Sequence, residues 1–281
     1  MEIKKIHTDN ALYQRLGVLK TNRNKRYRYG EFLIEGVRNL NEAVRKKWHI
    51  CSLVYPADTP LSGWAYDMLD GVKTDFNIEI TPALYEKLCG KTDGSELLAV
   101  AKMREDNLKD IKSGQSPLIL LFDRPSNRGN LGTVIRSCDS FGVDGIIITG
   151  HSVDLYDPEV IAATMGSFFS VPCVRISETK TIAEYISSMK DKYRGFTVIG
   201  STAHDKIRID SVDFTMPTLI MLGNETDGLS AALSEMCDVS ATIPMSAKSS
   251  ASSFNVSCAA TAMLYEAMRQ REFGYDMLPL K

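Results

Sequence analysis

Apolar residues recur along the second half of the chain in short runs, several of them β-branched, that alternate with helical or polar segments. The runs are LILLF (118–122), GIIIT (145–149), VPCVRI (171–176), FTVIG (196–200), TLIML (218–222) and ATIP (241–244). Continuous apolar runs of this length are typical of strands covered by helices on both faces. Helical patterns lie between them, over 131–141, 158–168, 181–190, 230–236 and about 256–271. The pattern predicts an α/β domain with a mostly parallel sheet.

The first hundred residues predict a smaller α/β unit. One helix is expected over 32–48, where four apolar residues fall on one face: Leu33, Val37, Leu40 and Val44. Two strands and a short helix follow, over CSLVYP (51–56), LLAVAKM (97–103) and SGWAYDMLDG (62–71). A polar stretch with Gly114 and Pro117 then indicates a linker.

These patterns divide the 281 residues into a first domain over 1–103, a linker over 104–117 and a second domain over 118–281. The chain shows no run of eighteen apolar residues, and its start, MEIKKIHTDN, is charged where an export signal would be apolar. We therefore expect a cytoplasmic protein without a membrane span. The six cysteines and four histidines are scattered without a Cys-x-x-Cys pair, so we expect reduced thiols and no metal site.

Charge is distributed unevenly, although the net charge is only −2. Residues 1–112 hold 19 Lys and Arg against 16 Asp and Glu, while the remainder holds 14 against 19. The stretch KTNRNKRYRYG concentrates basic side chains and interleaves them with Tyr27 and Tyr29, a combination that suits phosphate contact and base stacking. It predicts an RNA contact; the alternative is a solvated helix start or loop. The candidate RNA-binding residues are Arg23, Lys25, Arg26 and Arg28.

The loops after four of the apolar runs are candidates for chemistry, because open parallel sheets bind ligands at the carboxyl ends of their strands. These loops follow LILLF, FTVIG, TLIML and ATIP and are polar and rich in glycine or serine. The first, NRGNLG, has neither a dinucleotide fingerprint nor a P-loop lysine, so by itself it could equally be a turn with Asn130 as a helix cap.

The other two informative loops also have simple structural alternatives. In LIMLGNETDGLS the predicted strand stops at Gly223, which would allow a ligand close to the backbone. The alternative is an ordinary turn between a strand and a helix, capped at Asp227 or Ser230. In IPMSAKSSASSFNVS a serine-rich loop is held between a strand and a helix, with Asn255 or Ser253 as a possible cap.

Together, and in this order, the three loops resemble the motifs of the SpoU (TrmH) family of RNA ribose 2′-O-methyltransferases, within the SPOUT superfamily. GNLGTVIRSCDSFG matches the first motif, with Asn130 and Arg136 at its Asn and Arg positions. LGNETDGL matches the second, with Glu225 at its acidic position, and IPM with SSFNVSCA matches the third, with Asn255. One departure is Phe254, where many members have Leu. The resemblance covers about residues 118–272, and the N-terminal part is similar to the family's substrate-binding domain.

The resemblance implies a fold and a cofactor. The family's C-terminal domain has a deep trefoil knot, preceded here by the small α/β substrate-binding domain, and binds S-adenosylmethionine at the knot. The matched cofactor positions are Gly200, Ser201, Leu222, Gly223, Ile243, Met245, Ser253 and Phe254. Such segments supply backbone and apolar contacts, which suit an adenine ring.

The implied reaction is attack of a ribose 2′-hydroxyl on the methyl of the cofactor, and the matched catalytic residues are Arg136, Asn130, Glu225 and Asn255. Arginine stays charged in proteins, so we assign Arg136 to orienting phosphate and stabilising developing negative oxygen. The two asparagines would position the ribose or Arg136, and Glu225 would hold Arg136 or another polar group.

Members of the family act as homodimers, and the apolar face of the last helix, with Met263, Leu264 and Met268, suits either that interface or packing within the chain. The sequence thus predicts an RNA 2′-O-methyltransferase, with ribosomal RNA favoured over transfer RNA as the partner. The alternatives are a noncatalytic RNA-binding protein that uses the knotted domain as a dimer scaffold and, less well supported, a nucleotide-dependent oxidoreductase.

Overall fold

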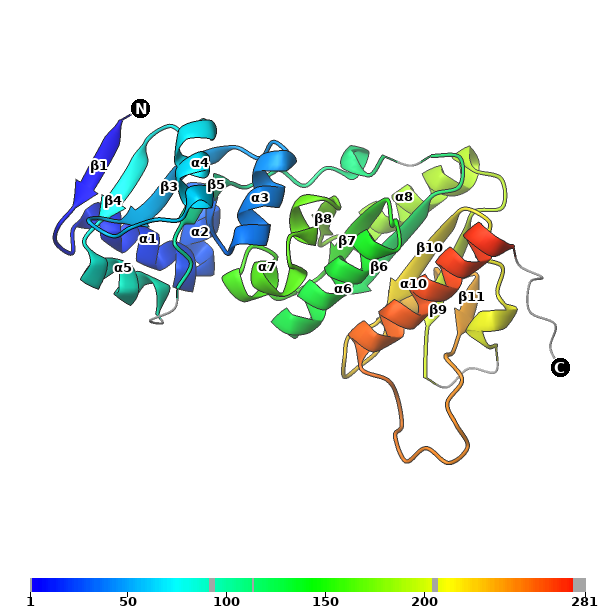
Figure 1. The fold of residues 1–281 in the computed structure, drawn as a ribbon. Helices are drawn as coiled ribbons and strands as arrows, with labels where there is room; N and C mark the ends of the chain where they lie inside the picture. Colours follow the sequence, from blue (N-terminus) through cyan, green and yellow to red (C-terminus); the bar gives the residue numbers. More distant parts are fainter. Residues whose placement is uncertain (1, 91–93, 113, 204–206, 275–281) are drawn as a thin grey trace. The chain divides into compact units, whose positions relative to one another are not determined.

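A computed structural model describes residues 2–90, 94–112, 114–203 and 207–274 of the chain, which divides into two compact units (Figure 1). The first unit is Met1–Glu105 with Asp154–Ser170, and the second is Asp106–Val153 with Val171–Lys281. The chain therefore passes between the units three times. The first passage falls inside the linker predicted over 104–117, but the segment 154–170, which the sequence pattern groups with the second domain, lies in the first unit.

The first unit contains a five-stranded mixed sheet in the order β1-β4-β3-β5-β2. β5 is antiparallel to both β3 and β2, while β1, β4 and β3 run parallel. The strands are β1 (Ile3–Ile6), β2 (Glu31–Glu35), β3 (Ile50–Pro56), β4 (Asn77–Ile80) and β5 (Leu98–Lys102). The helices are α1 (Ala11–Thr21), α2 (Arg23–Tyr29), α3 (Val37–Arg45), α4 (Gly63–Gly71), α5 (Pro82–Cys89) and α7 (Pro158–Thr164), with a 3₁₀ turn at Ser167–Phe169.

The helix predicted over 32–48 is wrong in its first part. Phe32, Leu33 and Ile34 belong to strand β2, where all three are buried. Three successive apolar side chains point to both faces of a strand, and here both faces are covered, whereas a surface helix buries only one stripe. Gly36, at φ 98°, turns the chain from β2 into α3, in a conformation that favours glycine.

A buried ion cluster holds the segment 154–170 within the first unit. Arg26 is 1% exposed. Its Nε donates to Asp154 Oδ2 at 2.7 Å, and its Nη2 lies 3.4 Å from Asp157 Oδ2. Tyr27 donates its hydroxyl to the second oxygen of Asp154 at 2.8 Å. The prediction that Arg26 binds RNA is therefore wrong, because its guanidinium is buried and paired with Asp154 and Asp157.

An aromatic cluster also connects the segment 154–170 to the rest of the first unit. The rings of Phe32 and Tyr156 have centroids 4.9 Å apart, and those of Trp48 and Phe168 are 5.4 Å apart. Trp48 also donates its indole N–H to the carbonyl of Phe169. Because aromatic pairs combine large buried area with preferred geometries, they supplement the ion cluster in fixing this segment to the first unit.

The second unit contains a six-stranded, all-parallel sheet in the order β11-β9-β10-β6-β7-β8, which confirms the predicted class of the domain. The strands are β6 (Leu118–Asp123), β7 (Gly145–Thr149), β8 (Cys173–Ile176), β9 (Thr197–Ser201), β10 (Thr218–Leu222) and β11 (Val239–Ala241). The helices are α6 (Arg128–Ser140), α8 (Thr179–Lys192), α9 (Ala231–Ser234) and α10 (Val256–Phe273), with 3₁₀ turns at Leu108–Asp110 and Ile209–Ser211.

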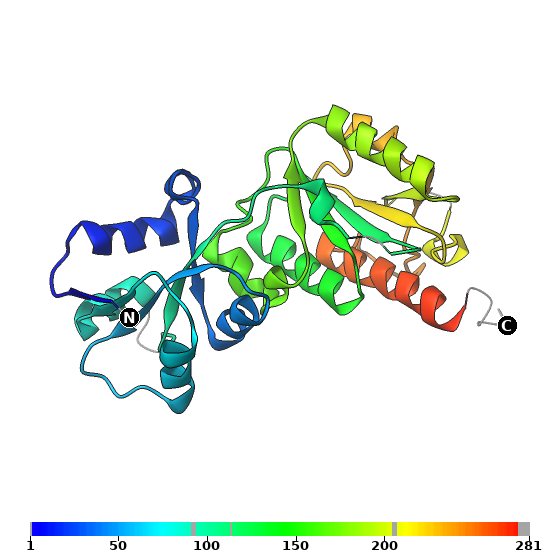
Figure 2. The ribbon, with the colours of Figure 1, turned by 90° about the horizontal axis from the view of Figure 1, so that it is seen from above.

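Helices cover both faces of this sheet (Figure 2). α8 and α9 pack on the face that carries Ile119, Leu121 and Leu219, while α6 and α10 lie side by side on the opposite face. Strand β11 ends at Ala241, three residues before the predicted run ATIP ends. The four strands β11, β9, β10 and β6 are neighbours, so the four loops singled out by the sequence leave adjacent strands.

Helix α10 is packed within its own unit. Met263 and Leu264 are buried, so these two side chains serve intrachain packing, one of the two alternatives that the sequence left open. At the far end, the Arg271 guanidinium donates to four backbone carbonyls, those of Ser116, Pro117, Phe214 and Met216. The helix is thus tied to two segments distant in sequence, and the predicted knot stays a prediction.

Replacing Arg26 by Met should destabilise the first unit by about 3–5 kcal/mol, since it leaves the buried Asp154 and the partly buried Asp157 without their cation. Thermal and urea unfolding would measure the loss. Arg28→Met is the matched control, because Arg28 lies on the same helix but is exposed; its effect should stay within about 0.5 kcal/mol. Equal stabilities of the two variants would contradict the buried cluster.

Candidate functional site

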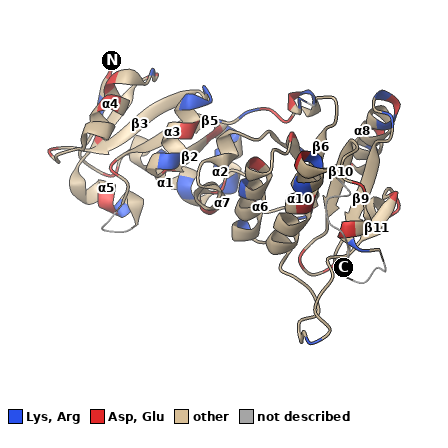
Figure 3. Cartoon of the chain, turned by 45° about the vertical axis from the view of Figure 1, so that its right-hand side comes forward, with Lys and Arg blue, Asp and Glu red and all other residues tan. Residues whose placement is uncertain are grey.

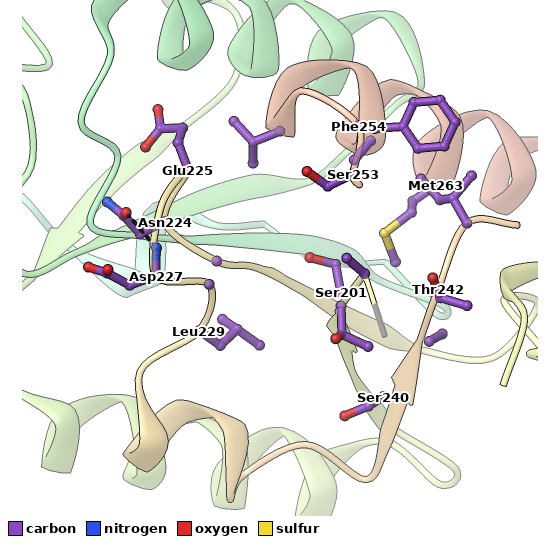
Figure 4. Close-up of a pocket in the computed structure, with 18 of the residues that line it drawn as sticks. Ser201, Asn224, Glu225, Asp227, Leu229, Ser240, Thr242, Ser253, Phe254 and Met263 are labelled. Atoms are coloured by element: carbon purple, nitrogen blue, oxygen red, sulfur yellow. Dashed lines mark hydrogen bonds between the residues drawn. The ribbon is translucent and has the colours of Figure 1, made fainter. Parts of the chain in front are cut away.

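A cavity of about 590 Å³ opens at the carboxyl ends of β9, β10 and β11 (Figure 4). Its walls come from the loops that follow these strands and from the start of α10. The lining residues are 201–203, 223–229, Ser234, 240–243, Met245, 252–254, Val256, Ala259 and Met263. The cavity therefore lies at the edge where parallel sheets bind ligands.

Six of the eight predicted cofactor positions line this cavity: Ser201, Gly223, Ile243, Met245, Ser253 and Phe254. The other two, Gly200 and Leu222, are each one residue earlier in their strand and are buried. Gly200 faces Cys237, and a side chain at position 200 would collide with it. Contact with a ligand stays a prediction for all eight.

Gly223 lines the cavity at a point where the chain folds back closely on itself. A Cβ at this position would overlap the backbone of Gly228 and Leu229, so no larger residue fits without a shift of the loop. The loop returns on itself because Asn224 N donates to Gly228 O at 2.9 Å and Gly228 N donates to Asn224 O at 3.1 Å. The segment 223–229 is therefore a tight turn whose outer surface forms one wall of the cavity.

Glu225 joins this turn to the start of α6. One carboxylate oxygen accepts from the backbone N–H of Ser126 at 3.0 Å and from its hydroxyl at 2.7 Å. The other accepts from Asn127 N at 3.1 Å and from Asn130 Nδ2 at 3.2 Å. With four donors around it, this carboxylate is an organising acceptor and has little capacity left for a substrate proton.

The two predicted asparagines continue from Glu225. Asn255 Nδ2 donates to Asn130 Oδ1 at 3.2 Å, and Asn255 Oδ1 accepts from Ser257 N at 2.9 Å as the N-cap of α10. Asn130 itself lies in the first turn of α6, whose cap is Asn127 and not Asn130. The structure thus brings Glu225, Asn130 and Asn255 into one hydrogen-bonded row that joins the turn 223–229 to the starts of α6 and α10.

Electrostatics support the ionised form of Glu225. Burial alone would raise its pKa, but the hydrogen bonds from Ser126 and Asn130 outweigh it and hold the pKa below the ordinary glutamate value. A group with a lowered folded-state pKa stabilises the fold above its unfolded pKa, and that contribution is lost as pH falls through the folded pKa. The row is therefore intact at neutral pH and weakens only in acid.

Arg136 does not join this row. Its side chain is exposed on α6, and among the described residues none forms a hydrogen bond or ion pair with its guanidinium. Arg136 lies six positions after Asn130, which places the two side chains about 120° apart around the helix. The expected contact between Glu225 and Arg136 is accordingly replaced by contacts to Ser126, Asn127 and Asn130.

Sequence reasoning missed several residues of this site. Ser126 and Asn127 supply donors to Glu225. Arg124 donates to Gly228 O in the turn 223–229, and Asp123 accepts from Ser230 N directly after that turn. Asp227 lines the cavity but was considered only as a helix cap. The one available signal was the polar run DRPSN directly after a buried strand, which marks a strand tip rich in side-chain donors and acceptors.

The basic stretch of the first unit contains the whole of α2 (Figure 3). Arg23 and Arg28 are exposed, and the Arg23 guanidinium lies over the ring of Tyr27 with 5.6 Å to its centroid. Lys25 is half-buried. Three of the four predicted RNA-binding side chains therefore reach the surface, and their role stays a prediction.

One group of side chains in the described part of the chain could hold a metal. The ligand atoms of His49, Cys51 and Asp75 lie within 4.8 Å of one another, and His49 Nε2 is 3.3 Å from Asp75 Oδ1. Burial raises the pKa of the Cys51 thiol to about 11, so a metal would have to displace its proton at neutral pH.

Within the residues described, no helix has the length and apolar character needed to cross a membrane.

Comparison with known protein families covers both units. Residues 117–265 match the model of the SpoU rRNA Methylase family, and residues 10–99 match the SpoU L30e-like domain. Together these matches span most of the chain, and the match over 117–265 includes the segment 154–170 that packs in the first unit.

Relatives of known sequence or structure agree with this assignment. The chain is 40% identical over 272 residues, 96% of its length and 94% of the relative's, to a 23S rRNA (uridine(2479)-2′-O)-methyltransferase of Streptomyces viridochromogenes. It is similar to the crystal structure of the SpoU methyltransferase AviRb from Streptomyces viridochromogenes in complex with the cofactor AdoMet, with 40% identity, a TM-score of 0.88 and coverage of 94% and 99%. A crystal structure of an RNA 2′-O ribose methyltransferase matches with 28% identity, a TM-score of 0.77 and coverage of 96% and 100%.

Glu225→Gln should disorganise the row, because an amide turns one acceptor oxygen into a donor that faces other donors. A loss of about 1.5–3 kcal/mol in stability is expected from the broken charge-assisted bonds. Thermal unfolding and ligand affinity would report it. Glu235→Gln, at an exposed position beside α9, removes the same charge from the same unit and should change neither. If the two variants behaved alike, the organising role of Glu225 would be lost.

Proposed function

The chain belongs to the SpoU rRNA methylase family, and we propose that it transfers the methyl group of S-adenosylmethionine to a ribose 2′-hydroxyl of ribosomal RNA. The observation that carries the proposal is the cavity at the carboxyl edge of the parallel sheet, directly beside the row of Glu225, Asn130 and Asn255. A binding cavity and a set of oriented polar side chains thus meet at one edge, as a transfer reaction between two bound molecules requires.

The residues of the cavity fit S-adenosylmethionine. Its volume of about 590 Å³ is in the range of small-molecule sites. Leu229, Ile243 and Met263 offer apolar contact for an adenine ring. Glu225 and Asp227 provide negative charge near a ligand that carries a sulfonium and an ammonium group. The close approach of the chain at Gly223 leaves backbone groups of the turn next to the cavity.

When bound, S-adenosylmethionine supplies a methyl group on a positively charged sulfur, which is already activated for transfer. What the chain must do is align the ribose hydroxyl and stabilise the charge that develops on its oxygen. The amide groups of Asn130 and Asn255 are held in one orientation by their mutual hydrogen bond and by Glu225, so they can present fixed polar groups to the ribose. Their hydrogen bonds are in place before the substrate arrives.

Arg136 would act from a second copy of the chain. Its guanidinium is exposed and lies on another side of α6 than Asn130, so within one chain it does not complete the row. A homodimer in which Arg136 of one protomer reaches the site of its partner would supply the missing positive charge. Exposed Tyr265, whose ring packs edge-on against Phe141, lies on α10 beside α6 and gives such a contact an apolar surface.

Ribosomal RNA is favoured as substrate because the similarity to the 23S rRNA methyltransferase extends over both units, including the N-terminal one. That unit exposes Arg23 and Arg28 on α2, and the half-buried ring of Tyr27 lies under the Arg23 guanidinium; basic side chains of this kind suit phosphate contacts. The first unit would hold the folded RNA while the second carries out the transfer.

Labelled methyl from S-adenosylmethionine should enter ribosomal RNA and not transfer RNA, when both are prepared from a strain without this gene. Nuclease digestion should then yield a 2′-O-methylated dinucleotide, since that ribose no longer supports cleavage. Label in transfer RNA alone would reassign the substrate. Absence of label from both pools, together with absent S-adenosylmethionine binding, would favour a noncatalytic RNA-binding scaffold.

Arg136→Ala should lower kcat by about 10²- to 10³-fold, the loss expected from one donor to a developing oxyanion, and leave S-adenosylmethionine affinity unchanged. An equimolar mixture of Arg136→Ala and Asn130→Ala chains tests the dimer. If Arg136 acts across the interface, mixed dimers contain one intact site and regain part of the activity. A mixture as inactive as each variant alone would place Arg136 in its own chain's site.

A further inference from the structure

Asp123 is the last residue of strand β6, and its carboxylate is buried. It is 2% exposed, and its Oδ1 accepts the Thr149 hydroxyl at 2.6 Å. Its Oδ2 accepts from Ser230 N at 2.9 Å and from Arg124 Nε and Nη2, each at 3.1 Å. Burial by itself would raise the pKa of Asp123, but the hydrogen bonds from Arg124 and Thr149 outweigh it and lower the pKa. The carboxylate is thus a fixed negative anchor.

The next residue, Arg124, has an unusual backbone. Its φ is 47°, in the left-handed region that residues other than glycine rarely adopt. Such a conformation persists only where surrounding contacts impose it. Hydrogen bonds hold both backbone groups of Arg124 in this conformation. Arg124 N donates to Thr149 O at 3.3 Å, and Arg124 O accepts from Asn224 Nδ2 at 2.7 Å.

This conformation directs the guanidinium to the turn that forms the cavity wall. Arg124 Nη2 donates to Gly228 O at 3.2 Å, and Nη1 lies 3.8 Å from Asp227 Oδ2. Gly228 O is the same oxygen that accepts from Asn224 N to close the turn. One arginine side chain therefore connects the buried Asp123 to the two residues, Asp227 and Gly228, that line the cavity.

We propose that Arg124 is a positioning residue for S-adenosylmethionine binding, which acts by fixing the 227–229 side of the cavity against the buried Asp123. The inference rests on the proposed function of the cavity. Glu225 holds the other end of the same turn to the residues that lead into α6, so the two contacts fix the turn at both of its ends. The planar guanidinium suits this task because its several donors serve Asp123 and Gly228 at once, which a lysine ammonium does less well.

A purely local structural role is the competing interpretation. Under it, loss of the guanidinium would lower thermal stability and the fraction of folded enzyme without changing the affinity of the folded molecules. The positioning role instead predicts a change in cofactor affinity and KM. The two interpretations therefore separate in a binding measurement on folded protein.

The test compares Arg124→Gln, Arg124→Lys and Arg124→Gly in the full chain by titration calorimetry with S-adenosylmethionine. Arg124→Gln should raise Kd and KM for S-adenosylmethionine about tenfold, as expected for a lost charge-assisted hydrogen bond, with kcat at saturation nearly unchanged. Arg124→Lys should be intermediate, since it keeps the charge beside Asp123. Arg124→Gly should match Arg124→Gln, because glycine accepts the backbone conformation but lacks the guanidinium.

Arg175→Gln is the matched control. Arg175 forms a comparable pair with Asp106 in the second unit, at 2.6 Å, but neither residue lines the cavity. It should bind S-adenosylmethionine like the wild type. The proposal is overturned if Arg124→Gln keeps wild-type affinity, if only kcat falls, or if Arg124→Gly binds normally. Failure of the wild type itself to bind S-adenosylmethionine would instead overturn the proposed function.

Discussion

The carboxylate of Glu225 joins parts of the chain that are about a hundred residues apart, and the rest of the site depends on it. Parallel pairing of β10 with β6, in which Leu222 lies beside Phe122, brings the two strand ends together. Glu225 then accepts four hydrogen bonds from the segment that follows β6, and Asn130 passes the contact on to Asn255 at the start of α10. Three loops without regular structure of their own thereby acquire one geometry.

Much of the second unit could be predicted from its sequence, because strands buried on both faces are continuous apolar runs. The run TLIML coincides with β10 and GIIIT with β7. The rule that ligands bind at strand carboxyl ends then selected the loops that line the cavity. Ser201, Gly223 and Ile243, which the match of motifs selected, line the cavity, whereas Gly200 and Leu222 are buried one residue earlier in the chain, and their contact with a ligand stays a prediction.

What the pattern could not predict depends on contacts between distant segments. Arg26 lies in a basic run typical of an RNA contact, and only the pairing with Asp154, 128 residues later, makes it a core residue. The same pairing assigns the segment 154–170 to the first unit. Strand β2 was taken as helical because its apolar residues continue the helical spacing of α3, and the covering of both its faces is a tertiary fact that periodicity does not contain.

Arg124 and Arg136 illustrate how position decides function among identical side chains. The guanidinium of Arg124 contacts acceptors of Asp123, Asp227 and Gly228. Its charge is therefore paired within the protein, where these contacts hold the cavity wall. Arg136, twelve residues later, is exposed and has no such acceptors in the described part of its own chain, so its charge is available to an incoming phosphate or oxyanion. A transfer site needs both kinds of residue. In the proposed reaction, Arg124 preserves the alignment of the bound molecules, and Arg136 responds to the charge that appears only when they react.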